Sequence, residues 1–128
     1  LADGLCATGV RAHAAPLLAA LLPDLTEWTT QVVIATQARV ALGDAIGEAL
    51  GAAVAAVLIG ERPGLSAMDS LGVYLTWAPR IGRTDADRNC ISNVRPEGLS
   101  YPEAARKLLW LIDAARSRRL SGVDLKED

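Results

Sequence analysis

The sequence has no phenylalanine, a single histidine and two cysteines, and aromatic residues make up 4% of it. One histidine and two cysteines that lie far apart, Cys6 and Cys90, do not provide the ligand set of a metal site. The two cysteines form neither a CxxC motif nor a disulfide framework, so a reducing cytoplasm is the expected compartment. Without phenylalanine, the core must be built from alanine, leucine, valine and isoleucine, which suit helices lying close on a sheet.

The chain also lacks an excess of charge of either sign, with 13 Lys and Arg against 15 Asp and Glu and a formal net charge of −2. Binding to nucleic acid or to an anionic membrane surface requires a local excess of lysine and arginine. The longest apolar run covers residues 49–60, and crossing a bilayer takes about 20 such residues. We therefore expect no nucleic acid and no membrane among the partners.

The length of 128 residues fits one domain over residues 1–128. The chain starts with Leu1 and Ala2 instead of methionine, and these two residues read as the end of an apolar strand. We expect residues 1–128 to be a fragment whose first strand and N-terminal region are truncated.

Short apolar runs separated by one helical stretch predict the fold. Residues 31–36 and 53–59 read as buried strands, residues 44–50 read as a helix between them, and residues 72–78 read as a further strand. Continuously apolar strands are typical of parallel sheets covered on both faces. The sequence therefore predicts an α/β fold, with a mostly parallel, Rossmann-like or flavodoxin-like sheet and helices on both faces.

Two longer helices are predicted near the ends of the chain. Residues 6–22 form a mostly helical stretch with a break near Pro16. A capping box, Ser100 and Glu103, opens a helix that runs to about Arg119. Residues 79–99, before that helix, are predicted to form a long polar loop.

In a parallel sheet, the loops that follow the strands meet at one edge and bind ligands there. Four segments would lie at this edge: residues 3–6, 37–43, 61–66 and 79–95. Two plainer interpretations stay open. Glu61 and Arg62 also fit a solvated surface turn, and residues 79–95 also fit a loop held by its own arginine and aspartate pairs.

The sequence shows no catalytic set of its own. It contains no G-x-S-x-G and no P-loop, and glycines 43, 47 and 51 are spaced by four, which does not match the dinucleotide fingerprint. Glycines at that spacing leave one face of the helix without side chains, so that a sheet or a ligand can approach closely. His13 lies in an alanine-rich helical segment, where a structural or solvent-facing imidazole is expected.

Several long strings resemble one family, the small subunit of ethanolamine ammonia-lyase. They are RVALGDAIGEALGA, IGERPGL, DSLGVYLTWAPR, DRNCISNVRPEGLSYPEAA and SGVDLKED. The resemblance implies an adenosylcobalamin enzyme that converts ethanolamine to acetaldehyde and ammonia by a radical route. It also implies a TIM-barrel large subunit that holds ethanolamine and most catalytic groups, and a small subunit with a Rossmann-like domain that covers the cobalamin.

The resemblance implies three cofactor-binding residues, which are Val40, Glu61 and Cys90. Val40 and Cys90 would contact the corrin, and Glu61 would accept hydrogen bonds from its amide side chains. Three neighbours could assist: Arg62, Arg80 and Asn89. No catalytic residue is expected in this chain, because the resemblance assigns most catalytic groups to the large subunit. No metal ligand is expected either, because the D-x-H-x-x-G motif that ligates cobalt is absent around the one histidine, His13.

Two other functions stay open on the sequence. One is a stand-alone flavodoxin-like module that binds a nucleotide or a partner protein, and the other is a structural subunit whose alanine-rich helices only pack against a partner. The expected location is the cytoplasm, and the sequence does not decide whether that includes a bacterial microcompartment.

Overall fold

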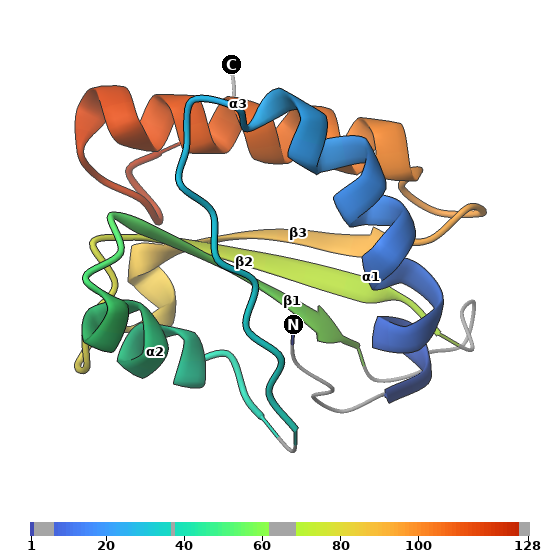
Figure 1. Ribbon diagram of the computed structural model, residues 1–128, viewed down its shortest axis with the longest axis horizontal. Coiled ribbons are helices and arrows are strands. Elements are labelled where there is room, and N and C mark those ends of the chain that lie inside the picture. Colours follow the sequence, from blue (N-terminus) through green and yellow to red (C-terminus); the bar gives the residue numbers. More distant parts are fainter. Residues whose placement is uncertain (2–6, 37, 62–68, 126–128) are drawn as a thin grey trace.

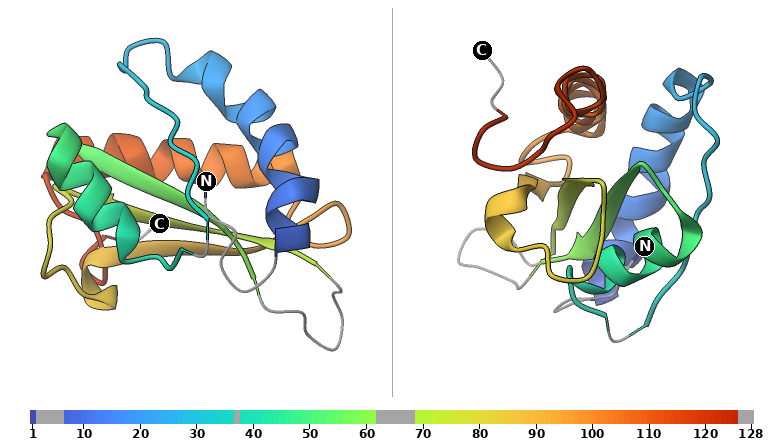
Figure 2. Two further views of the ribbon diagram at one scale, coloured as in Figure 1. Left: turned by 60° about the horizontal axis from the view of Figure 1, so that its bottom comes forward. Right: turned by 90° about the vertical axis from the view of Figure 1, so that its left-hand side faces the viewer.

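Three strands form one sheet, with helices on either side of it (Figure 1). The structure is a computed structural model and describes residues 1, 7–36, 38–61 and 69–125. Its main elements are α1 (Ala7–Leu21), α2 (Leu42–Leu50), β1 (Val54–Gly60), β2 (Leu71–Trp77), β3 (Arg88–Val94) and α3 (Tyr101–Arg118). Helices α1 and α3 cover one face of the sheet and α2 lies against the other, as the end-on view in Figure 2 also shows.

The sheet is antiparallel, so the predicted mostly parallel, Rossmann-like or flavodoxin-like sheet is wrong. Its order is β1-β2-β3, and both pairs of neighbours run antiparallel. The connection between β1 and β2 spans only residues 61–70, and a parallel crossover takes about a dozen residues or more. The apolar pattern predicted parallel strands because β2 is largely buried on both faces. It therefore lacks the alternation of apolar and polar residues that marks a half-exposed antiparallel strand.

The first predicted strand, residues 31–36, is also wrong. Residues 31–34 are exposed and lie outside the three-stranded sheet, with Ile34 77% exposed. The segment is nevertheless tied to the start of the chain, because the Ala35 amide donates to the Leu1 carbonyl at 2.8 Å. Its β-branched residues fit an extended backbone, which here runs beside the sheet without joining it.

Strand β3 lies inside the segment predicted as a loop. Only Ile91 and Val94 of this strand are buried, so it carries too few apolar residues to be recognised from hydrophobicity. It is held in the sheet by pairing with β2 from Thr76↔Arg88 to Leu71↔Val94.

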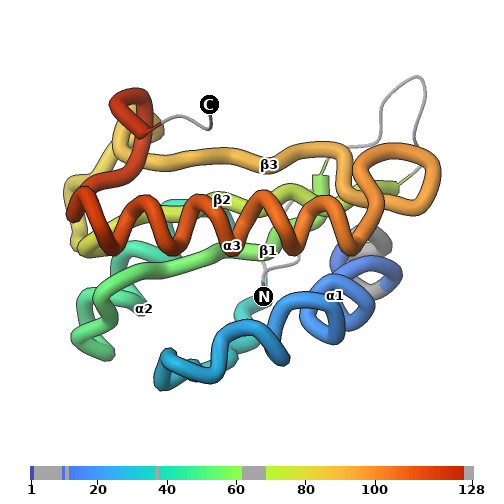
Figure 3. The backbone as a smooth tube through the Cα atoms, turned by 90° about the horizontal axis from the view of Figure 1, so that it is seen from above, coloured from blue at the N-terminus to red at the C-terminus, as the bar shows by residue number. Residues whose placement is uncertain are grey.

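The main core fills the space between the sheet and the pair α1 and α3. In Figure 3, α3 passes across the strands and α1 lies along the β1 side of the sheet. Leu17, Leu75 and Leu108 are fully buried there, and the core is aliphatic as the composition predicts. Helix α1 continues through Pro16, so the predicted break is wrong. Ser100 caps α3 by accepting a hydrogen bond from the Glu103 amide at 3.4 Å, which confirms one of the two hydrogen bonds of the predicted capping box. No helix in the described part of the chain is long and apolar enough to span a membrane.

Candidate functional site

The face of the sheet turned away from α1 and α3 gathers most of the predicted site residues. Successive side chains of a strand alternate between faces, and the register sets Tyr74 between Val57 on β1 and Cys90 on β3. We call this surface the open face; its strand residues are Ala55, Val57, Ile59, Gly72, Tyr74, Thr76, Arg88, Cys90 and Ser92. Helix α2 covers the end of it near Thr76 and Arg88. Farther along, Ala38 and Val40 pack with Ile59 and the half-buried Tyr74. Cys90 and Ser92, on the β3 side, are exposed.

Two glycines let α2 lie directly on the open face, as their spacing predicts. A Cβ on Gly43 would clash with the Val57 side chain, and a Cβ on Gly47 would come within 2.5 Å of the Pro79 ring. The helix ends at Gly51, whose φ of 65° is the left-handed conformation that glycine adopts without strain.

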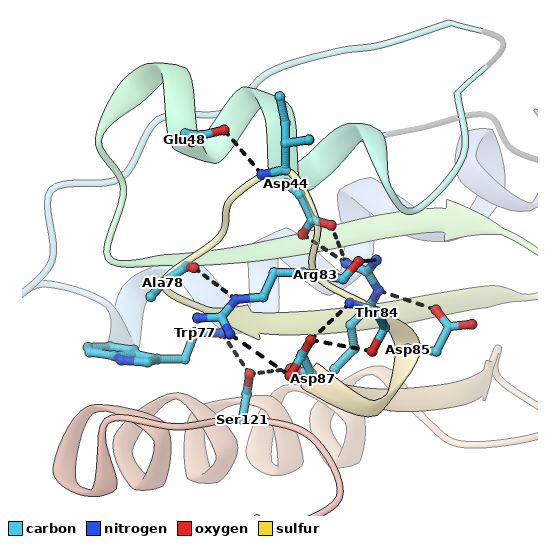
Figure 4. Close-up of polar contacts among 11 residues, drawn as sticks. Asp44, Glu48, Trp77, Ala78, Arg83, Thr84, Asp85, Asp87 and Ser121 are labelled. Atoms are coloured by element: carbon cyan, nitrogen blue, oxygen red, sulfur yellow. Dashed lines mark hydrogen bonds and ion pairs between the residues drawn. The ribbon is translucent and has the colours of Figure 1, made fainter.

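A buried ion pair fixes α2 to β3. The Nη1 atom of Arg88 donates to both carboxylate oxygens of Asp44, at 2.8 and 2.7 Å, and each side chain is 5% exposed. Arg88 also donates to Asp85 and to the Arg83 carbonyl, both at 3.3 Å, and Figure 4 shows the surrounding polar contacts. Burial alone would lower the pKa of Arg88, but its bonds to Asp44 and Asp85 outweigh burial and raise that pKa. The pair therefore holds α2, and the turn before it that carries Val40, in place.

The loop before β3 is held by its own charges. Arg83 lies 3.9 Å from Asp87, whose carboxylate also accepts from the Thr84 amide at 2.9 Å. Together with the Arg88 to Asp85 bond, these contacts support the interpretation that this part of residues 79–95 is a loop held by its own arginine and aspartate pairs.

Glu61 is fixed at the end of the open face that lies away from α2. Its Oε1 atom accepts from the Ser70 hydroxyl at 2.9 Å and from the Asn93 amide at 2.8 Å. The Asn93 amide is available because β3 is irregular opposite Leu71 to Val73, and Asn93 has a φ of 60°. Gly72 leaves room for the carboxylate, since a Cβ there would lie 3.1 Å from Oε2.

The Oε2 atom of Glu61 is the oxygen left to bind a ligand. The Ser70 hydroxyl and the Asn93 amide both donate to Oε1, and Oε2 has no hydrogen-bond partner among the described residues. A carboxylate held in this way is a fixed acceptor beside an open sheet surface. Its predicted neighbour Arg62 lies outside the described residues.

Val40, Tyr74 and Cys90 form the rest of the surface. Val40 and Tyr74 pack on a small cluster built around Ala38 and Ile59. Cys90 is exposed and free, and its Sγ lies 3.2 Å from the Ser92 hydroxyl. Burial raises the pKa of Tyr74 to about 12, and a hydrogen bond with Cys90 and the negative charge of Glu61 add to this effect. Tyr74 is therefore a neutral phenol that can donate a hydrogen bond.

The structure thus brings the predicted trio together, but not at the predicted place. In an antiparallel sheet, successive strands end at opposite edges, so the loops after β1 and β2 do not share an edge. Val40, Glu61 and Cys90 instead border the open face, and Tyr74 lies among them. Sequence reasoning missed Tyr74 and Gly72, because β2 is largely buried on both faces and the string GVYLTW gives no alternation that would mark them.

Two of the assisting residues do not belong to this surface. The side-chain amide of Asn89 donates to the carbonyls of Gly122 and Leu125, at 3.1 and 2.8 Å, and accepts from the Gly122 amide at 2.6 Å. Asn89 therefore anchors the C-terminal segment. Arg80 is exposed in the turn after β2, at the end of the sheet that α2 covers.

His13 lies on the other side of the sheet, as a buried residue of α1. Its Nδ1 is 2.6 Å from the Tyr101 hydroxyl on α3, and its Nε2 is 3.5 Å from an Asp69 oxygen. These contacts join α1 to α3, which is a structural role. Within the described residues no group of three or more histidine, cysteine or acidic side chains is placed to hold a metal ion.

An apolar groove along the outer edge of β1, with a volume of about 560 Å³, is another candidate for a ligand site. Among its described lining residues, which include Trp28, Val33 and Leu50, the charged side chain is that of Arg39. Small-ligand sites use several convergent polar groups to fix orientation. The open face, with its fixed carboxylate, phenol and thiol, is therefore the better candidate.

Comparison with known proteins identifies the family. The family model described as ethanolamine ammonia-lyase light chain matches residues 1–126. Relatives named ethanolamine ammonia-lyase small subunit include one from Azotobacter vinelandii, 59% identical over 100% of this chain and 48% of the relative, and one from Rhodopseudomonas palustris, 59% identical over 100% and 50%. A third, from Rhodococcus erythropolis, is 58% identical over 99% of this chain and 51% of its own length. The chain spans about half the length of these relatives, and it belongs to the ethanolamine ammonia-lyase light chain family.

Proposed function

We propose that this chain is part of the small subunit of an adenosylcobalamin-dependent ethanolamine ammonia-lyase, and that its open face binds the cobalamin against a catalytic large subunit. The enzyme would convert ethanolamine to acetaldehyde and ammonia by a radical mechanism. The observation that carries the proposal is the Glu61 carboxylate, which is fixed through one oxygen and free at the other among the described residues.

The residues present fit a corrin. A corrin is a broad, flat ring with carboxamide side chains around its rim, so it needs an apolar surface beside hydrogen-bond acceptors. Val40 and Cys90 offer contact to the ring or its substituents, and Glu61 accepts from an amide N–H. When bound, the cofactor supplies the radical chemistry, while the protein supplies binding and orientation.

The division of labour follows from what the open face holds. Its polar groups are an acceptor, a neutral phenol and a thiol, and no base is paired with a nucleophile there among the described residues. We therefore assign ethanolamine and the catalytic groups mainly to the large subunit, which we expect to be a TIM barrel. The antiparallel sheet removes the basis for a stand-alone flavodoxin-like module. The proposed location is the cytoplasm, including a bacterial microcompartment in cells that form one.

The test uses the small subunit at its natural length, assembled with its large subunit. The affinity for adenosylcobalamin is measured by absorbance titration for the wild type, Glu61→Gln and Cys90→Trp, with Glu97→Gln as the control because Glu97 is an exposed carboxylate paired with Arg95. We expect Glu61→Gln to weaken binding about tenfold, as for a lost hydrogen bond to a charged group, and Cys90→Trp to weaken it by obstruction. Unchanged affinity in both variants would reject the site, and a wild-type assembly that neither binds cobalamin nor converts ethanolamine would reject the function.

A further inference from the structure

Tyr74 occupies the middle of the open face and has no role in the site inferred from the sequence. We propose that Tyr74 and Glu61 act as a pair that recognises one carboxamide side chain of the bound cobalamin, with the phenol donating to the amide oxygen and Oε2 of Glu61 accepting from the amide nitrogen. This inference rests on the proposed function, because it names how the same surface would select its ligand.

The spacing on β2 suits such a pair. Gly72 and Tyr74 are two residues apart on the same side of the strand, a separation of about 7 Å. The Oε2 atom of Glu61 lies over Gly72, 3.1 Å from where a Cβ would be. Glu61 Oε2 and the Tyr74 side chain are therefore placed at neighbouring positions on one face of β2, where a single amide group could meet both.

The chemistry of the two groups is complementary to an amide. Glu61 as a carboxylate can only accept hydrogen bonds, while Tyr74 as a neutral phenol can donate. Tyr74 lies opposite Cys90 in the β2–β3 register, and sulfur is a weaker hydrogen-bond acceptor than an amide oxygen. Cys90 would keep its contact with the Ser92 hydroxyl at 3.2 Å.

The pair would also reject a carboxylate in place of the amide. A carboxylate has no N–H for Glu61, and its negative charge would face the fixed charge of the Glu61 side chain. Specificity of this kind comes from the group left without its hydrogen bond and from like-charge repulsion. The pair would therefore select cobalamins whose side chain at this position is an intact amide.

The experiment measures cobalamin affinity by absorbance titration of the assembled enzyme carrying Tyr74→Phe, which removes only the hydroxyl. We expect about fivefold weaker binding, as for one neutral hydrogen bond. Tyr101→Phe is the matched control, because Tyr101 is the chain's other tyrosine and contacts His13 on the far side of the sheet. Equal affinity of Tyr74→Phe and wild type would overturn the pair and leave the proposed function standing, whereas a wild type that binds no cobalamin would overturn the proposed function itself.

A second measurement needs no variant. The wild-type assembly is titrated with cobalamins in which one carboxamide at a time has been hydrolysed to a carboxylate. We expect one isomer to bind at least tenfold more weakly than the intact cofactor, and its deficit to shrink in Glu61→Gln, where the repulsion is gone. Equal binding of all isomers would overturn the pair, even if Tyr74→Phe did not fold.

Discussion

Neutralising Asp44 should destabilise the fold far more than neutralising its exposed neighbour Asp85. In Asp44→Asn, the Arg88 guanidinium stays buried but loses the charge that it contacts at 2.7 and 2.8 Å. Removing one partner of a buried ion pair costs about 3–5 kcal/mol. Arg88 keeps its bonds to Asp85 and to the Arg83 carbonyl, so we expect a loss near the lower end, about 3 kcal/mol.

The assay is urea unfolding followed by circular dichroism and by tryptophan fluorescence. A loss of about 3 kcal/mol, with a urea slope of about 1–3 kcal/mol per molar, lowers the midpoint by roughly 1–3 M. Asp85→Asn is the matched control, because the Asp85 side chain is 98% exposed and such a pair contributes less than about 1 kcal/mol. Equal midpoints for the two variants would refute the reasoning that the Asp44 to Arg88 pair fixes α2 to the sheet.

Three further outcomes follow from the contacts. Gly72→Ala places a Cβ against the Glu61 carboxylate. This change should weaken cobalamin binding about tenfold, as for a lost hydrogen bond to a charged group, and should change the melting temperature little. Unchanged affinity would contradict this prediction. Gly122→Ala meets the Ala86 carbonyl at a φ of 97° and should lower the urea midpoint, and a wild-type midpoint would show that this turn is not tight. The pKa of Tyr74 rises from 10.0 to about 12 on folding. The stability that this shift contributes is therefore complete below pH 10 and is lost as the pH rises towards 12. The urea midpoint should fall more steeply with pH in wild type than in Tyr74→Phe.

The elements that depend on local signals could be predicted from the sequence. The start of α3 at Ser100, the end of α2 at Gly51 and the ranges of β1 and β2 agree with the structure to within one or two residues. Caps and apolar runs act over a few residues, so they are readable without the rest of the fold.

The direction of the strands could not be read from those signals. Continuously apolar sequences made β1 and β2 resemble parallel strands, although the short connection over residues 61–70 was evidence for antiparallel pairing. Strand β3 escaped notice because its open-face residues are polar and its pairing with β2 supplies the stability that hydrophobicity did not indicate.

The site likewise combines residues that the sequence indicates with residues that only the fold identifies. Val40, Glu61 and Cys90 followed from resemblance to a family, and the structure gives them a common surface. Tyr74 and Gly72 belong to that surface only through the sheet register, which depends on residues far apart in the chain. The open face therefore needed the fold before it could be recognised.

The most direct test of the open face as the cofactor site is protection of Cys90. Its thiol is exposed on that face, so its alkylation can be followed by peptide mass spectrometry in the assembled enzyme with and without adenosylcobalamin. The account predicts that saturating cobalamin slows labelling of Cys90 at least tenfold. Labelling at the same rate in both samples, with cobalamin shown to be bound, would contradict it.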